Sequence, residues 1–110
     1  TLVSDFSNEV GTDGSSGAND ITLSGGATGS STIQITWTNI SSPKLGFSIE
    51  RKIVWEQDSA FKVIMNVGAA LLAYGDSGLQ SSTTYSYRVR AIFSQGYSNY
   101  SNVVNITTNP

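Results

Sequence analysis

The fold of this chain is decided by residues 79–91, which read Leu-Gln-Ser-Ser-Thr-Thr-Tyr-Ser-Tyr-Arg-Val-Arg-Ala. From Tyr85 onward, apolar and polar residues alternate one by one. Successive side chains of a β-strand point to opposite faces, so this period of two predicts a strand over residues 84–92 with one buried face. The inward residues are expected to be Tyr85, Tyr87, Val89 and Ala91, and the outward ones Ser86, Arg88 and Arg90.

Six further strand-like runs surround this stretch, and turn-forming residues separate them. The run that contains Ile33, Ile35 and Trp37 alternates cleanly. The pair Gly25-Gly26 is expected to be a turn that ends the first run. Consecutive apolar residues at 63–65 indicate either a β-bulge or a strand that is covered on both faces. The seven expected strands cover residues 21–24, 32–38, 45–53, 61–67, 71–76, 84–92 and 100–107.

Seven short strands at this spacing predict an all-β antiparallel sandwich, with one sheet of three strands and one of four. A chain of 110 residues has room for one such core. Ser, Thr, Asn and Gly are abundant and charged residues make up only 13%, which disfavours long amphipathic helices. The expected core consists of Trp37, Phe47, Ile49, Tyr74, Tyr85, Tyr87 and Val89.

Composition also argues against several classes of function. The net charge of −2 and the lack of a Lys/Arg run exclude a basic surface for nucleic acid. No apolar run is long enough to predict a membrane span. The sequence has neither Cys nor His, so disulfides, thiolate metal sites and the commonest general base are excluded. Its eight acidic residues are dispersed, and Glu50 is expected to form a solvated pair with Arg88 or Arg90. We therefore expect no enzyme and no cofactor.

Several stretches together resemble the fibronectin type III domain, in the version common in bacterial extracellular and surface proteins. The resemblance extends from about Asp20 to Thr108. Two departures stand out, because Ser81 replaces the family's proline and residues 94–97 lack the integrin-binding tripeptide of some animal members. The stretches that carry the resemblance are residues 79–85 with Tyr87, Val89 and Ala91, then Trp37, residues 46–51, residues 98–104 and residues 107–108.

The resemblance implies an immunoglobulin-like sandwich of seven strands. In such a domain Tyr85 forms the tyrosine corner, in which its hydroxyl bonds to nearby backbone, and Trp37 and Leu79 are structural residues. The resemblance also implies a non-catalytic structural or adhesive spacer module of a secreted or cell-surface protein. Its expected partners are neighbouring domains or subunits, with a polysaccharide or a surface protein as alternatives.

The N-terminal residues 1–19 are expected to be separate from the domain at residues 20–110. They contain a strand-like segment with Leu2, Val3, Phe6 and Val10, followed by a Gly/Ser linker. Residues 4–10 resemble residues 98–104 at an offset of 94 residues, from Ser4 to Ser98. The segment is therefore either the last strand of a preceding repeat or a strand donated to another subunit, which would build an extracellular filament.

Two loop aromatics are candidates for contact with a partner or ligand. Trp55 lies in the loop after the third strand, where it could stack on a sugar ring and make the domain a carbohydrate-binding module. We expect it instead to fold back over one end of the sandwich. The same two alternatives, contact with a partner or cover for the core, apply to Tyr97 at the other end. A calcium site at Asp13 and Asp20 is weighed against a plain linker, and the linker is preferred because two carboxylates are a thin ligand supply.

Overall fold

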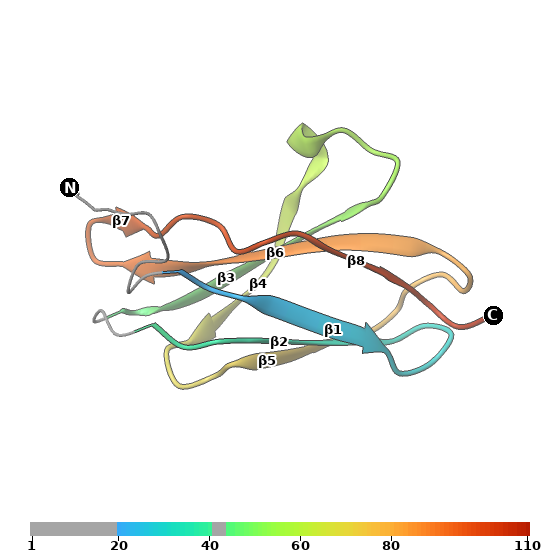
Figure 1. Cartoon of the computed structure of the whole chain (residues 1–110), viewed down its shortest axis with the longest axis horizontal. Helices are drawn as coiled ribbons and strands as arrows, with labels where there is room; N and C mark the ends of the chain where they lie inside the picture. Colours follow the sequence, from blue (N-terminus) through green and yellow to red (C-terminus); the bar gives the residue numbers. More distant parts are fainter. Residues whose placement is uncertain (1–19, 41–43) are drawn as a thin grey trace.

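A computed structural model describes residues 20–40 and 44–110 and consists of two antiparallel sheets that face each other (Figure 1). The first sheet has the order β1 (Leu23–Ala27), β2 (Ile33–Trp37), β5 (Ala73–Asp76). The second has the order β4 (Lys62–Gly68), β3 (Gly46–Ile53), β6 (Thr84–Phe93), and β6 also pairs with β7 (Gly96–Tyr97) and β8 (Val104–Thr107). A short 3-10 helix, η1 (Asp58–Ala60), precedes β4. The predicted all-β sandwich is confirmed, with β7 as an extra short strand.

The core lies between the two sheets, and the alternation in β2 and β6 places its side chains there. Ile33, Ile35 and Tyr87 are fully buried. The rings of Trp37 and Phe47 contact each other with centroids 5.6 Å apart. Tyr74 was expected in the core but is only partly buried, because β5 is the edge strand of its sheet. The buried apolar residues of the described chain are Ile21, Leu23, Ile33, Ile35, Trp37, Ile40, Phe47, Ile49, Leu79, Tyr85, Tyr87, Val89, Ala91 and Ile106.

The first strand differs from its prediction, because β1 runs through the two glycines that were expected to form a turn. Gly25 pairs with Ile35 of β2. A Cβ atom on Gly25 would lie 2.5 Å from the carbonyl oxygen of Gln34 and 3.0 Å from Cδ1 of Ile106. A glycine is therefore needed here for close approach of the strand to its neighbours, and a turn does not explain it.

The fourth strand contains the bulge that was one of two alternatives. Ile49 is opposite Met65 and Glu50 is opposite Val63, so Ile64 is the extra residue. The shift sends Val63 to the outer face of the sheet, the face on which Glu50 lies. The three consecutive apolar residues are thus explained by a change of register within β4.

The last strand begins at Val104, four residues later than expected, because side-chain hydroxyls take the place of backbone acceptors before it. The backbone N–H of Ala91 donates to the hydroxyl of Ser98 at 2.8 Å, and that of Val89 donates to the hydroxyl of Ser101 at 2.9 Å. The N–H groups of Ser98 and Ser101 donate in return to Ala91 O and Val89 O, so residues 98–101 follow β6 through mixed backbone and hydroxyl bonds without forming a regular strand.

The chain enters the sandwich at one end, which we call the entry pole, and leaves it at the other, which we call the exit pole (Figure 1). The entry pole contains Leu45 and Tyr97, next to the start of β1 and the end of β6; Leu45 N–H bonds to Ile92 O at 2.8 Å. The exit pole contains Val54 and Trp55. It lies beside the C-terminal residues, since Val54 N–H bonds to Thr84 O, and Thr84 is paired with Thr107.

Candidate functional site

The outer face of the second sheet carries a stack of alternating aromatic rings and cations, which we call the cation–aromatic stack. Its members, in order, are Phe61, Arg88, Tyr100, Arg90 and Tyr97. The Cζ atom of Arg88 lies 4.1 Å from the ring centre of Phe61 and 3.8 Å from that of Tyr100. The Cζ atom of Arg90 lies 4.5 Å from Tyr100 and 3.8 Å from Tyr97. Each guanidinium is thus held between two rings, an arrangement that is favourable by cation–π attraction.

Glu50 lies beneath this stack and is only 4% exposed. Its Oε1 accepts bonds from Nε and Nη2 of Arg88 at 2.9 and 2.8 Å, and its Oε2 accepts from the hydroxyl of Tyr100 at 2.8 Å. Burial and the hydrogen bond to Glu50 raise the pKa of Tyr100 above its ordinary value. The expected partner is correct, but the expectation of a solvated pair is wrong, because the rings of the stack exclude water from this carboxylate.

The stack also belongs to a clasp that fixes the last segment of the chain to both sheets. Ser98 and Ser101 bind the backbone of β6, as described above. Asn102 reaches the first sheet, where its Oδ1 accepts from Leu23 N–H at 2.8 Å and its Nδ2 donates to Leu23 O at 2.9 Å. A side-chain amide thereby acts as a strand partner for the free edge of β1. Residues 98–102 seat the end of the chain by these specific contacts.

A second polar group joins the two sheets through the core. The buried carboxylate of Asp76, at the end of β5, accepts from the hydroxyl of Tyr87 at 2.6 Å and pairs with Nη1 of Arg51 at 2.7 Å. Burial, together with the hydrogen bond to Asp76, raises the pKa of Tyr87 well above its ordinary value. From the sequence, Asp76 was expected only as the last residue of the fifth strand, with no partner named. A buried tyrosine on β6 needs a partner for its hydroxyl, and this requirement could have indicated a buried acceptor opposite Tyr87.

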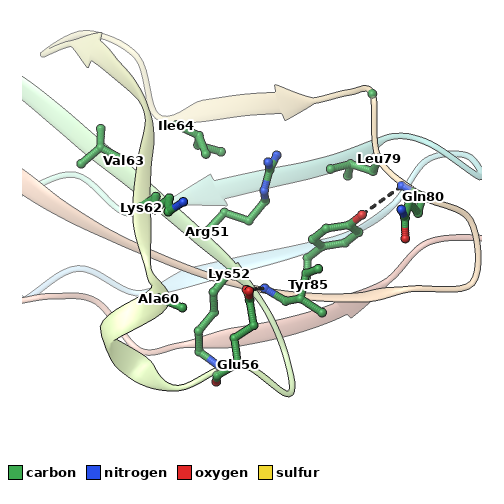
Figure 2. Close-up of a pocket in the computed structure, with 12 residues that line it drawn as sticks. Arg51, Lys52, Glu56, Ala60, Lys62, Val63, Ile64, Leu79, Gln80 and Tyr85 are labelled. Atoms are coloured by element: carbon green, nitrogen blue, oxygen red, sulfur yellow. Dashed lines mark hydrogen bonds between the residues drawn. The ribbon is translucent and has the colours of Figure 1, made fainter.

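An open groove lies between β4 and the connection from β5 to β6, and Figure 2 shows it. It has a volume of about 600 Å³. Arg51 and Tyr85 form its floor, Lys62 and Ile64 of β4 stand on one side, and the Leu79-Gln80 turn forms the other. We call this hollow the β4 groove.

The tyrosine that was predicted to form a corner lies in this groove. The hydroxyl of Tyr85 accepts a hydrogen bond from the backbone N–H of Gln80 at 2.9 Å. The Cζ atom of Arg51 lies 5.6 Å from the centre of its ring. Leu79, the other structural candidate, is buried, and its N–H bonds to Ser31 O at 3.1 Å. The turn before β6 is therefore tied to both the tyrosine ring and the first sheet.

Replacing Tyr85 with phenylalanine is expected to destabilise the domain by about 1–3 kcal/mol, because the N–H of Gln80 loses its acceptor in a part-buried site. Urea unfolding followed by tryptophan fluorescence measures this loss. The matched control is Tyr97→Phe, because no described residue hydrogen-bonds to the hydroxyl of Tyr97. Equal stability of the Tyr85 and Tyr97 variants would show that the hydrogen bond from Gln80 N–H to the Tyr85 hydroxyl does not contribute to the free energy of unfolding.

The remaining sequence candidates are not brought together into one site. Trp55 is 74% exposed at the exit pole, so the expectation that it covers the core is wrong. Tyr97 is 56% exposed at the entry pole, with Arg90 against its ring. The strand-like segment with Leu2, Val3, Phe6 and Val10, like Asp13 of the linker, lies outside the described residues.

The described residues contain no group of three or more potential metal ligands. In the same part of the chain, no helix has the length and apolar character that crossing a bilayer requires.

The two packed sheets, the Greek-key order of their strands and the tyrosine corner define an immunoglobulin-like β-sandwich module. The model of the fibronectin type III domain matches residues 18–107. The chain therefore belongs to the fibronectin type III family, as its residues suggested. Domains of this family are generally structural or adhesive modules of larger proteins, commonly extracellular or at the cell surface, and are generally not catalytic.

Solved structures of the same family are similar to the chain. The sixth fibronectin type III domain of human fibronectin type III domain containing protein 3 has a TM-score of 0.71 and 26% identity, over 91% of this chain and 93% of that one. The chicken CNTN1 FN1-FN3 domains have a TM-score of 0.74 and 22% identity, over 80% of this chain. The match spans 31% of the CNTN1 fragment, which contains several such domains. A search of curated proteins finds no match.

Proposed function

We propose that this chain is a non-catalytic spacer module in a tandem array of fibronectin type III domains, in a secreted or cell-surface protein. The observation that carries the proposal is the clasp at residues 98–102. The N-terminal segment at residues 4–8 repeats its sequence pattern, with Ser, an aromatic residue, Ser and Asn at the same spacing. Neighbouring modules are therefore the expected partners.

Each repeated position has a defined role in the clasp. The two serines accept from backbone N–H groups of β6, the aromatic ring enters the cation–aromatic stack, and the asparagine holds β1. Ser4, Phe6, Ser7 and Asn8 supply two hydroxyls, an aromatic ring and an amide in the same order, without the hydroxyl of Tyr100. Residues 1–10 thus carry the side chains that seat a last strand on a sandwich of this design. This favours a preceding repeat at residues 1–19 and one domain at residues 20–110.

A chimera tests the clasp directly. Residues 98–104 are replaced by the sequence of residues 4–10, which requires only Asn99→Asp, Tyr100→Phe and Val103→Glu. Asn99 and Val103 are exposed, so the main loss is the hydroxyl of Tyr100 on Glu50, and we expect a folded domain destabilised by at most about 2 kcal/mol. Thermal unfolding measures it. A control adds Ser98→Val and Ser101→Val to the chimera and should fail to fold. An unfolded chimera would contradict the repeat.

Exposed apolar side chains at the two poles support contact between successive modules. Trp55 at the exit pole is 74% exposed, and Leu45 at the entry pole is 65% exposed. Because the chain leaves beside Trp55 and enters beside Leu45, head-to-tail modules bring these surfaces together.

A chain of two copies, residues 1–110 followed by residues 11–110, tests this contact. We expect Trp55→Ala in the first copy to remove a blue-shifted component of tryptophan emission, since that Trp55 faces the second copy. The same substitution in the second copy is the control, because no module follows it. If both substitutions change the emission alike, Trp55 does not mediate contact between modules.

The exposure of Trp55 also favours a second candidate, a carbohydrate-binding accessory module, because an exposed indole offers a flat surface to a sugar ring. In that case Trp55→Ala in a single module should abolish retention on a polysaccharide column.

The third candidate, a filament built by donation of residues 1–10, requires a vacant edge. The position that these residues resemble is filled by residues 98–104 of the same chain, so the donated strand would have to use another edge. Loss of oligomers on deletion of residues 1–10 would favour the filament over the array.

A further inference from the structure

We propose that the β4 groove binds an acidic peptide segment in extended conformation. This site is separate from the clasp and from the entry pole, it borders the exit pole at Glu56, and it does not depend on the array. Three observations carry the proposal: an excess of positive charge, hydrogen-bond donors without acceptors, and a free strand edge beside an apolar floor.

The charge of the groove is opposite to that of the chain. The chain has a net charge of −2 and six Lys and Arg residues in total. Three of them, Arg51, Lys52 and Lys62, line the groove together with one carboxylate, Glu56. Glu56 Oε1 accepts from Ile53 N–H at 2.8 Å, and the Nζ of Lys52 is bonded to the carbonyl oxygens of Val54 and Glu56. Because Arg51 is paired with Asp76, Lys62 is the cation of this hollow whose charge no described residue meets, and it favours an anionic ligand.

Two of these cations face each other across neighbouring strands. Arg51 of β3 is the direct partner of Lys62 of β4 in the register of the sheet. Like charges directly opposite each other are unfavourable in a sheet. Asp76 neutralises Arg51, but Lys62 makes no hydrogen bond or ion pair with any described residue. A carboxylate from outside would supply the counter-charge that Lys62 lacks among the described residues.

Further donors point into the same space. The hydroxyl of Tyr85 accepts from Gln80, and its own proton has no acceptor among the described residues. The side-chain amide of Gln80 is exposed and likewise makes no bond within the described part of the chain. Figure 2 shows Arg51 and Tyr85 on the floor of the hollow, with Lys62 on one side and Gln80 on the other. The groove therefore offers donors to carboxylates and carbonyls, since neither the Tyr85 proton nor the Gln80 amide has an acceptor in the described part of the chain.

The wall of the groove explains why the ligand is a peptide. β4 is the edge of its sheet, so one row of its backbone N–H and C=O groups has no strand beside it among residues 20–40 and 44–110. Extended peptides bind such edges by strand addition, in which main-chain bonds give affinity and side chains alternate between groove and solvent. An acidic strand with its glutamates inward places their carboxylates near Lys62 and its backbone along β4. Ile64 and Leu79 supply apolar surface for the methylene groups of these inward side chains.

The test is an NMR titration of the full chain at low salt with a ten-residue peptide that alternates glutamate and valine. We expect saturable shifts of the backbone amides of Lys62, Ile64 and Gln80. Lys62→Glu should weaken binding by about tenfold or more, because it reverses the unpaired charge. The matched control is Lys44→Glu at the entry pole, which changes the net charge equally and should leave the affinity within about twofold. Lys62 is exposed, so its variant is expected to fold, and its amide spectrum verifies this.

The remaining arms decide between ligand classes. A peptide with lysine in place of glutamate should cause no shifts in the groove. Free glutamate at the same carboxylate concentration should cause much weaker shifts, because it cannot pair along β4. Equal shifts with free glutamate, an equal effect of the two lysine variants, or shifts confined to the cation–aromatic stack would overturn the proposal.

Discussion

Replacement of Glu50 with alanine is expected to destabilise the domain by about 2–4 kcal/mol, one of the two largest effects that we predict for a single polar residue. The carboxylate is buried and binds Arg88 and Tyr100, while Arg90 approaches it to 3.9 Å. Without it, two guanidinium groups lie close together with no counter-charge. Removing one partner of a buried pair typically costs about 3–5 kcal/mol, and the partial exposure of both arginines reduces this.

Urea unfolding of the Glu50→Ala variant measures the effect, and Glu50→Gln is expected to recover part of it, because an amide oxygen still accepts one bond. Asp58→Ala is the matched control, since its carboxylate is exposed and no described residue bonds to it. The NMR signals of residues 98–101 should broaden in the alanine variant, since Tyr100 loses its anchor. A loss below about 1 kcal/mol would mean that the stack behaves as an ordinary surface ion pair.

The second large effect is expected for Asp76→Ala, at about 2–4 kcal/mol. This carboxylate is the acceptor for the hydroxyl of Tyr87, whose residue is fully buried, and the counter-charge of Arg51. Its removal leaves a hydroxyl without a partner in the core, and a buried polar group without a partner costs about 1–3 kcal/mol in addition to the lost ion pair.

A double-mutant cycle separates these contributions. Asp76→Ala combined with Tyr87→Phe should be less destabilised than the sum of the two single variants, because the hydroxyl that lost its acceptor is then absent. Urea unfolding at neutral pH provides all four values. Strict additivity would contradict the claim that the two side chains act as one group.

The fold could be predicted from the sequence because most strands have one solvent-exposed face and one buried face. The alternation around Trp37 and Tyr85 is a local property, and burial of one face follows from it. The glycines of β1 misled the prediction for a physical reason. Gly25 is required by its contacts with Gln34 and Ile106, and the latter residue is far away in the sequence.

The polar groups could be predicted only in part. Glu50 and its arginines were found from their outward positions on neighbouring strands. Its burial was missed because the covering rings come from Phe61, just before β4, and from Tyr100 in the segment after β7, whose positions the sequence does not specify. The pair of Asp76 and Tyr87 joins opposite sheets, and facing positions across a core have no periodic signature. The β4 groove depends in the same way on how an edge strand lies beside a turn.

The positions of the two poles determine how the module responds to tension. The chain enters at one end of the sandwich and leaves at the other, and β8 is hydrogen-bonded to β6 along that direction. Hydrogen bonds of an antiparallel ladder lie perpendicular to the strands. A pull on the two termini therefore shears the bonds of β8 all at once, where an unzipping geometry would break them one after another. The asparagine that holds Leu23 shares this load between the first and last strands, so the domain resists extension as a unit.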